Sequence, residues 1–189
     1  MDDCEVVSSS YARMFREVSD PNTPADVLES MAGVLMVEIR EALAHNPNCP
    51  AKLLRKLSTD VDWSVRYTAV WNKNCPKDVI EERSTDTQPA VRTAVAFNAP
   101  VETLRKLSMD PAGEVRRSVA ENRACPREIL TSLGSDPDKY VLVAVAANPH
   151  CPRQVLVDLF VHPDPLVSHS ALSNPNCPED IKLMHYITT

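Results

Sequence analysis

The chain has 189 residues, a formal net charge of −6 at pH 7 and only three glycines. This length suits one domain and is ample for a hydrophobic core. The acidic balance argues against a broad phosphate-binding surface, without excluding a local basic stripe. So few glycines leave little room for hairpins and none for a Gly-rich phosphate loop.

No apolar run approaches the roughly 18 residues that are needed to cross a membrane. The longest candidate, residues 31–37, is followed at once by Glu38 and soon by Arg40. The first residues, Met1 to Glu5, are acidic, which is the reverse of a secretory signal. We therefore expect a cytoplasmic protein that does not associate with a membrane.

The first predicted element is a helix within residues 1–19. Apolar and aromatic side chains recur there at helical spacing: Tyr11, Met14, Phe15 and Val18. Ser8 to Ser10 can cap this helix. Because repeats follow it, we predict that 1–19 form an N-terminal helical cap over the first exposed core.

From residue 20 onward one motif recurs: Asn-x-x-Cys-Pro, then an apolar pair, a leucine, an aspartate and Val-Arg. Its first position is filled by Asn46, Asn72, Asn98, Asn122, Asn148 and Asn174, with Asp20 in a degenerate first copy. Most copies are 26 residues apart, a period that is typical of solenoids, which generally bind rather than catalyse. We predict six helical repeats over 20–173 and a C-terminal half repeat over 174–189.

Each repeat predicts two short helices. The first begins at the proline of the fifth position, because proline suits the first helical turn; Thr23 before Pro24 would be a good N-cap. The second helix begins near an aspartate of the fifteenth position, as in Asp110-Pro111 and Asp136-Pro137, where the aspartate would cap it. It ends at the asparagine of the next motif.

These residues together resemble the leucine-rich repeat variant family, whose consensus reads Asn-Pro-x-Thr-Pro-x-x-Leu-Leu-x-x-Leu-x-x-Asp-x-x-x-x-Val-Arg-x-x-Val-Ala. The resemblance covers about residues 20–181. It implies an all-α fold: a right-handed helical-repeat solenoid of alternating short α- and 3₁₀-helices with no sheet. HEAT-like helix pairs are the near alternative. The family's type example holds an iron–sulfur cluster with an N-terminal cysteine cluster, but this chain has only Cys4 there, so we expect no cofactor.

The third copy is irregular. Asn98-Ala99-Pro100 is two residues short, and Arg83 stands where other repeats have a leucine: Leu57, Leu107, Leu133 and Leu159. One interpretation is drift tolerated by a surface turn, with the Arg83 head in water. The other is a kink or a contact site in the middle of the solenoid.

Five cysteines share the fourth position: Cys49, Cys75, Cys125, Cys151 and Cys177. Stacked helices lie roughly 8 to 10 Å apart, so thiols from neighbouring repeats are too distant to share zinc or to form a disulfide. We predict reduced, buried, metal-free thiols in a reducing compartment. Because none of the histidines stands in a catalytic or metal-binding motif, we also predict that the protein is not an enzyme.

Four arginines occupy the position after the conserved valine or isoleucine: Arg40, Arg66, Arg92 and Arg116. They predict a column along one surface, and two interpretations stay open. In the first, each arginine pairs with a nearby acid or helix-end carbonyl. In the second, they form a basic stripe for an acidic partner or a nucleic-acid backbone, extended by Arg55, Lys56, Arg105, Lys106 and Arg117.

Aromatic residues are few but gathered. Trp63, Tyr67 and Trp71 are four residues apart on one predicted helix, on a face nearly opposite Val65, and Phe97 follows one repeat after Trp71. Either the curvature of the solenoid buries these rings, or they form an interface, since exposed aromatic patches and Trp or Tyr side chains are typical of binding sites.

The leading hypothesis is a non-catalytic scaffold that binds another protein through its solenoid surface. We assign the partner-binding site to six residues: Trp63, Tyr67, Trp71, Phe97, Arg66 and Arg92. The alternative is a nucleic-acid-binding helical-repeat protein that uses the arginine column of Arg40, Arg66, Arg92 and Arg116.

Overall fold

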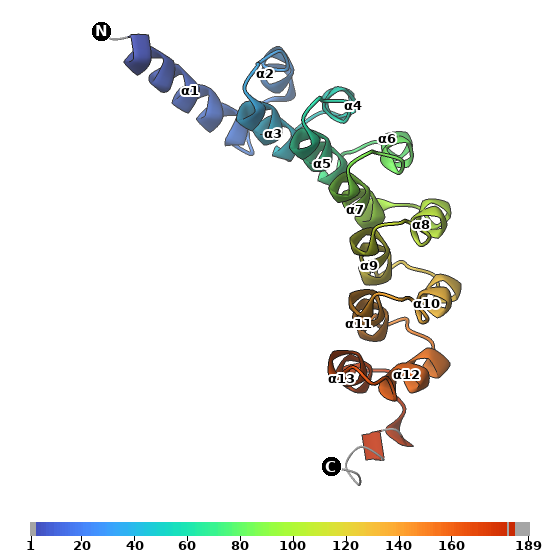
Figure 1. The fold of residues 1–189 in the computed structure, drawn as a ribbon. Helices are drawn as coiled ribbons and strands as arrows, with labels where there is room; N and C mark the ends of the chain where they lie inside the picture. The colour runs from blue at the N-terminus through green and yellow to red at the C-terminus, as the bar shows by residue number, and fades with distance from the viewer. Residues whose placement is uncertain (1–2, 181, 184–189) are drawn as a thin grey trace. The chain divides into compact units, whose positions relative to one another are not determined.

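The computed structural model describes residues 3–180 and 182–183, with side chains from Ser10 onward, and shows thirteen helices and no strand in this part of the chain (Figure 1). The predicted all-α fold is thereby confirmed. A long helix, α1 (Asp3–Ser19), precedes six helix pairs. The first helices of the pairs are α2 (Ala25–Ser30), α4 (Ala51–Leu57), α6 (Lys77–Arg83), α8 (Val101–Leu107), α10 (Arg127–Leu133) and α12 (Arg153–Phe160). The second helices are α3 (Val37–His45), α5 (Trp63–Trp71), α7 (Pro89–Asn98), α9 (Gly113–Glu121), α11 (Lys139–Ala147) and α13 (Pro165–Ser173).

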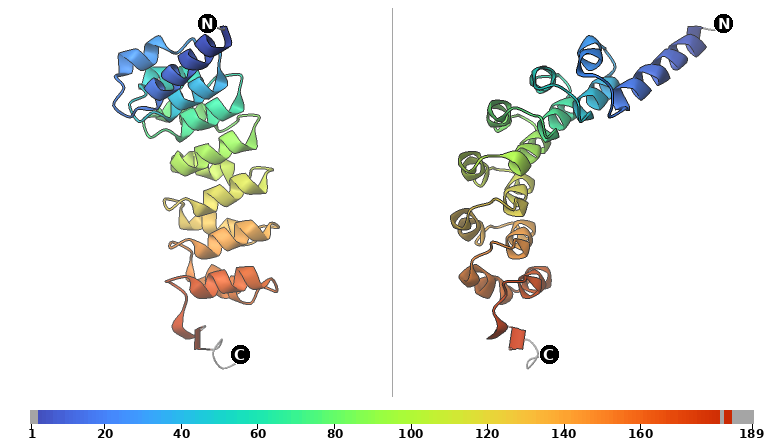
Figure 2. Two further views of the ribbon diagram at one scale, coloured as in Figure 1. Left: turned by 90° about the vertical axis from the view of Figure 1, so that its left-hand side faces the viewer. Right: turned by 180° about the vertical axis from the view of Figure 1, so that it is seen from behind.

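The chain divides into two compact units, Met1–Asn98 and Ala99–Thr189. Within each unit the second helices stack on one another in one layer, and the first helices form a second layer beside them (Figures 1 and 2). In the first unit α1 packs against α3 and so extends the layer of second helices. The division falls at the irregular third copy of the motif.

The first helices start one residue later than predicted. The proline of each motif is the N-cap, with extended backbone, as Pro50 shows with φ −73° and ψ 149°. Its carbonyl accepts the first intrahelical bond, from Leu54 N at 3.0 Å, and it has no N–H that would need a partner. Thr23, which we predicted as a cap, instead donates its hydroxyl to the Glu17 carbonyl.

The alternation with 3₁₀-helices that the family resemblance implied is wrong for the described residues. All six first helices are α-helical and six to eight residues long. The bond from Leu54 N to Pro50 O spans the four residues of α-helical geometry. Three buried leucines of α4 face the second helices, namely Leu53, Leu54 and Leu57.

The second helices are capped two residues after the predicted aspartate. Asp62 is the N-cap of α5, and its side chain accepts from Ser64 N. The aspartate of the fifteenth position shapes the loop before the cap, because Asp60 Oδ1 accepts from Asp62 N at 2.9 Å. His162, which replaces that aspartate in the last repeat, also takes this loop position: its Nδ1 accepts from Asp164 N.

The motif asparagines link each repeat to the one before it. The Nδ2 of Asn148 donates to the carbonyls of Ala120 and Asn122, at 2.7 and 3.1 Å, and its Oδ1 accepts from His150 N at 2.8 Å. Asn72 and Asn174 make the same three bonds in their own repeats. These side chains are buried, so the amide satisfies main-chain groups that water does not reach.

Asn46 shows that α1 takes the place of a second helix. Its Nδ2 donates to the carbonyls of Val18 and Asp20, which lie 28 and 26 residues earlier, as in the other repeats. Residues 1–19 therefore continue the repeat pattern in space although they lack its sequence motif. The C-terminal half repeat that we predicted over 174–189 includes residues 181 and 184–189, which lie outside the described residues.

Asn98 departs from the ladder. We predicted a buried or half-buried side chain, but Asn98 is exposed, and its Nδ2 reaches the Val70 carbonyl at 3.3 Å. The reason is local: two residues after Asn98 stands Pro100, which has no N–H to donate to the Asn98 Oδ1. Arg83, in the same irregular region, turns toward Asp86 (4.0 Å) rather than into water, and its Nε is buried without a hydrogen-bond partner among the described residues.

The five motif cysteines are buried and are not in disulfides. Burial raises the pKa of Cys49 to about 12 and that of Cys75 to about 11, and the pKa values of Cys125 and Cys151 rise for the same reason. The thiols are therefore neutral at physiological pH, and they fill the space under each loop as small apolar groups.

Replacing Asn148 by leucine should lower the free energy of unfolding by about 1 to 3 kcal/mol, because two carbonyls and one N–H lose their partner in a buried site. Urea unfolding of the whole chain measures this loss. The control is Asn98→Leu, which removes one long bond at an exposed position and should change stability much less. An Asn148→Leu protein as stable as the wild type would show that the ladder contributes nothing.

Cys75, Cys125 and Cys151 should react slowly with a thiol reagent in the native protein, because reaction needs both access and the thiolate. Rapid titration of all five motif thiols without denaturant would contradict this packing. We expect Cys4 to react quickly, but its side chain lies outside the described residues. As pH rises above about 9, the unfolded thiols ionise while the folded ones stay neutral, so stability should fall.

Candidate functional site

Three of the predicted aromatic side chains are in contact on the surface of the first unit. The rings of Tyr67 and Trp71 are stacked, with centroids 6.1 Å apart and planes 7° from parallel. Trp71 meets Phe97 edge to face at 4.7 Å. Trp63 lies two turns before Trp71 on α5 and is 47% exposed. We call these four residues the aromatic patch.

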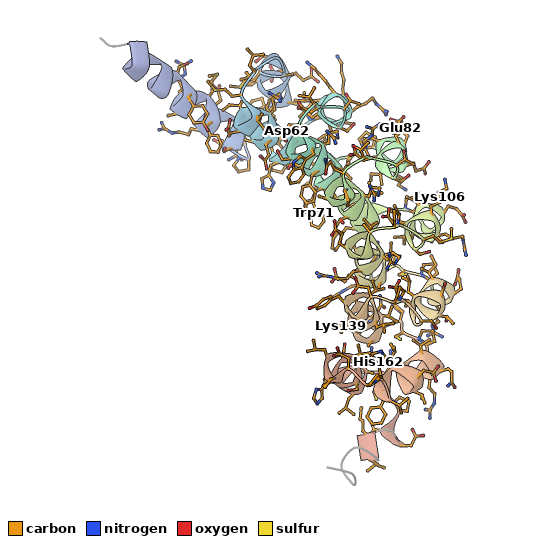
Figure 3. The ribbon with its side chains drawn as sticks, viewed as in Figure 1. Asp62, Trp71, Glu82, Lys106, Lys139 and His162 are labelled. Carbon is orange, nitrogen blue, oxygen red and sulfur yellow. The ribbon has the colours of Figure 1, made fainter. Side chains whose placement is uncertain are left out.

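The local sequence explains why the rings face outward. The core face of α5 is formed by Val65, Thr68, Ala69 and Val70, all of which are buried. Trp71 is 42% exposed and lies on the side of α5 that is turned away from α4 and α6 (Figure 3). Phe97 is 38% exposed at the same repeat position of α7. The outward faces of neighbouring second helices therefore form one surface.

Beside the patch the surface is hollowed. A cavity of about 430 Å³ lies between the outward faces of α1, α3 and α5, and a cavity of about 230 Å³ continues from it to Trp71. Both are lined by His45, Pro47 and Thr68. The sequence analysis missed the first cavity, although the helical spacing of Phe15 in the N-terminal segment was a signal for it.

Arg66 and Arg92, which we expected beside the patch, point elsewhere. The Nε and Nη2 of Arg66 each bond Asp86 at 2.8 Å, and its Nη1 bonds the Asp60 carbonyl. The Nη1 of Arg92 bonds the Asp86 carbonyl at 2.7 Å. These groups belong to the loops before α5 and α7, whereas Trp71 and Phe97 stand near the other ends of those helices.

The arginine column is built into the fold by ion pairs between neighbouring repeats. Each pair joins an arginine to the aspartate 20 residues later through two hydrogen bonds: Arg40 to Asp60, Arg66 to Asp86, and Arg116 to Asp136. The arginine side chains are only 12–14% exposed. This geometry favours the structural interpretation of the column over a basic stripe that meets a partner.

The pairing changes the pKa values of the aspartates. Burial by itself raises the pKa of Asp86, but the hydrogen bonds from Arg66 and from the Gln88 N–H outweigh it and hold the pKa below its usual value. The pKa values of Asp60 and Asp136 are lowered in the same way. The hydrogen bond to Asp86 likewise raises the pKa of Arg66.

The described residues contain no group of three or more His, Cys, Asp and Glu side chains that could hold a metal ion. None of the helices in this part of the chain is both long and apolar enough to cross a membrane.

Asp86→Asn should lower the free energy of unfolding by about 2 to 3 kcal/mol at neutral pH, because it leaves the buried Arg66 without its counter-charge. Since the folded pKa of Asp86 is depressed, the stability from this pair is present above the unfolded pKa of about 4 and is lost as pH falls through the folded value. Urea unfolding at several pH values measures both effects.

The matched control is Asp78→Asn, which breaks the exposed pair of Asp78 with Arg55 (2.6 Å) and should change stability little. If the two variants lose the same stability, the arginine column is a surface feature and not a structural link.

The comparisons with known proteins agree with this architecture. The leucine-rich repeat variant family model matches residues 113–138. A solved structure described as a leucine-rich repeat variant with a novel repetitive structural motif is 23% identical and covers 90% of this chain and 78% of its own, with a TM-score of 0.66. An engineered protein is 17% identical over 97% of this chain and 98% of its own, but its TM-score of 0.40 supports no argument. No curated protein sequence matches the chain significantly. The predicted resemblance is thus confirmed: the chain carries leucine-rich repeat variant repeats in a helical-repeat fold.

Proposed function

We propose that the protein is a non-catalytic scaffold that binds another protein through the aromatic patch of its first unit. Helical repeats of this kind are a scaffold architecture, because stacked helix pairs present an extended and rigid surface. The outward faces of α3, α5 and α7 form that surface, while the polar links between repeats lie at the ends of these helices.

The observation that carries the proposal is the position of Trp71. Its ring is joined to Tyr67 on one side and to Phe97 on the other, yet 42% of the residue is exposed. The chain has nine aromatic residues, two Trp, four Tyr and three Phe, and four of the nine lie in this patch. Trp and Tyr anchors on a rigid surface are typical of the few residues that dominate binding energy.

The nucleic-acid alternative finds less support in the geometry. It needs Arg40, Arg66, Arg92 and Arg116 to reach phosphates, but three of these guanidinium groups are held in pairs with aspartates and Arg92 bonds a loop carbonyl. Affinity for nucleic acid that falls steeply with salt would revive this alternative. We also propose a cytoplasmic location, because buried free thiols suit a reducing compartment.

Replacing Tyr67 and Trp71 by alanine should weaken partner binding by at least 2 kcal/mol, which is more than tenfold in affinity, because anchor rings contribute most of the energy of such interfaces. The thermal midpoint should change little, since both rings face outward from the α5 core. Capture of proteins from a lysate of the cells that make the protein, followed by titration of the captured partner, provides the measurement.

Tyr140→Ala is the matched control, because Tyr140 is 54% exposed and lies in the second unit, away from the patch. Equal recovery of the partner by the Tyr67→Ala/Trp71→Ala protein and by the control would contradict the proposal. A large loss of thermal stability in the double variant would instead assign these rings to the core.

A further inference from the structure

The aromatic patch opens into a groove with acidic side chains along one wall. The groove consists of the two cavities described above, which share His45, Pro47 and Thr68 and run from Phe15 of α1 to Trp71 of α5. Its two ends are therefore aromatic. Glu38 and Glu41 of α3 line it near the Phe15 end, and Lys73 lines it near the Trp71 end.

The two carboxylates have no cation within the protein. Among the described residues neither Glu38 nor Glu41 forms a salt bridge, and Glu41 only accepts a long hydrogen bond from the Ser64 hydroxyl at 3.4 Å. The protein otherwise pairs its arginines with acids across neighbouring repeats, as in Arg40–Asp60 at 2.7 Å. Two unpaired negative charges in one apolar groove give the groove a preference for a positively charged ligand.

The second unit shows what the same surface looks like when it is neutralised internally. A cavity of about 330 Å³ lies between its second helices at the corresponding repeat positions. There Arg117 and Glu121, both on α9, form an ion pair at 2.8 Å on the cavity wall. The first unit has no such cation at its groove wall, so a partner is required to supply it.

Building on the proposed function, we propose that the groove receives a basic, apolar segment of the partner protein: a Lys or Arg side chain between Glu38 and Glu41, and an apolar or aromatic side chain against Trp71. The cation belongs at the Phe15 end because Lys73 would repel it at the other end. Nucleic acid is a poor occupant, since two carboxylates repel phosphates.

The spacing of the helices sets the length of the segment. Two steps between neighbouring helices, from α1 to α3 and from α3 to α5, span about 16 to 20 Å. An extended chain advances about 3.3 Å per residue, so the two anchors of the segment are about five or six residues apart. The cation stands between them, nearer to the side chain that contacts Phe15.

Selection from a library of random peptides displayed on phage tests the proposal on the full chain. The selected peptides, made synthetically, should carry Lys or Arg between apolar side chains. They should change the fluorescence of the protein directly, because its two tryptophans, Trp63 and Trp71, both lie on α5 beside the groove. Titration of labelled peptides against variants then measures the contribution of each side chain.

The Glu38→Gln/Glu41→Gln protein should bind the selected peptides about tenfold more weakly than the wild type, and the wild-type affinity should fall as salt is raised. The matched control is Glu82→Gln. Glu82 is an exposed glutamate of α6 that points away from the Trp71 side of the same unit, so its substitution should change nothing (Figure 3). Should the double variant lose stability, Glu38→Gln alone decides, because the Glu38 side chain makes no hydrogen bond among the described residues.

Two results would overturn the inference in distinguishable ways. If the selected peptides need Trp71 but are acidic or neutral, or bind the glutamine variant as tightly as the wild type, the basic occupant is wrong while the aromatic interface stands. If no selected peptide depends on Trp71, the aromatic interface fails as well.

Discussion

The side-chain amide of the motif asparagine is the interaction on which the repeat depends. Its Nδ2 reaches carbonyls 26 and 28 residues earlier, and its Oδ1 holds the N–H two residues later, as in Asn148. One side chain thus satisfies two consecutive loops in a place that water does not reach. An aspartate would set its charge against two carbonyls, and leucine would leave all three groups unpaired. The period of the sequence is the distance that this amide bridges.

A second polar link works in the other direction along the chain. The arginine near the start of each second helix reaches forward 20 residues to an aspartate, as in Arg66–Asp86, while the asparagine after the end of the helix reaches back. Both ends of a second helix are therefore fixed by internal bonds. The outward face between them takes part in neither link, so side chains such as Tyr67 are free to vary there at little cost to stability. Stability and binding are carried by different faces of the same helix.

The sequence was sufficient for the helix pairs and the buried asparagines, because both follow from a strict period. It misled where two residue types satisfy one position: the proline caps its helix instead of entering it, and Asp60 shapes the loop while Asp62 caps α5. The charge of Arg66 could not be assigned, because its partner lies in the next repeat and either interpretation fitted the motif. The groove was missed since α1 lacks the motif, and only the bonds from Asn46 to Val18 and Asp20 reveal that α1 is equivalent to a second helix.

The irregular copy shows how the two faces meet. Asn98 has lost most of the amide link because Pro100 offers no N–H, so the last turn of α7 is held by a single bond of 3.3 Å from this side chain. Phe97 stands in that turn, and its edge contact with Trp71 at 4.7 Å ties the end of α7 to α5. The aromatic patch therefore supplies a link between helices at the point where the asparagine ladder is weakest. Tyr67, which lies in the middle of α5 and takes no part in that link, is the ring whose contribution to binding separates most cleanly from its contribution to the fold.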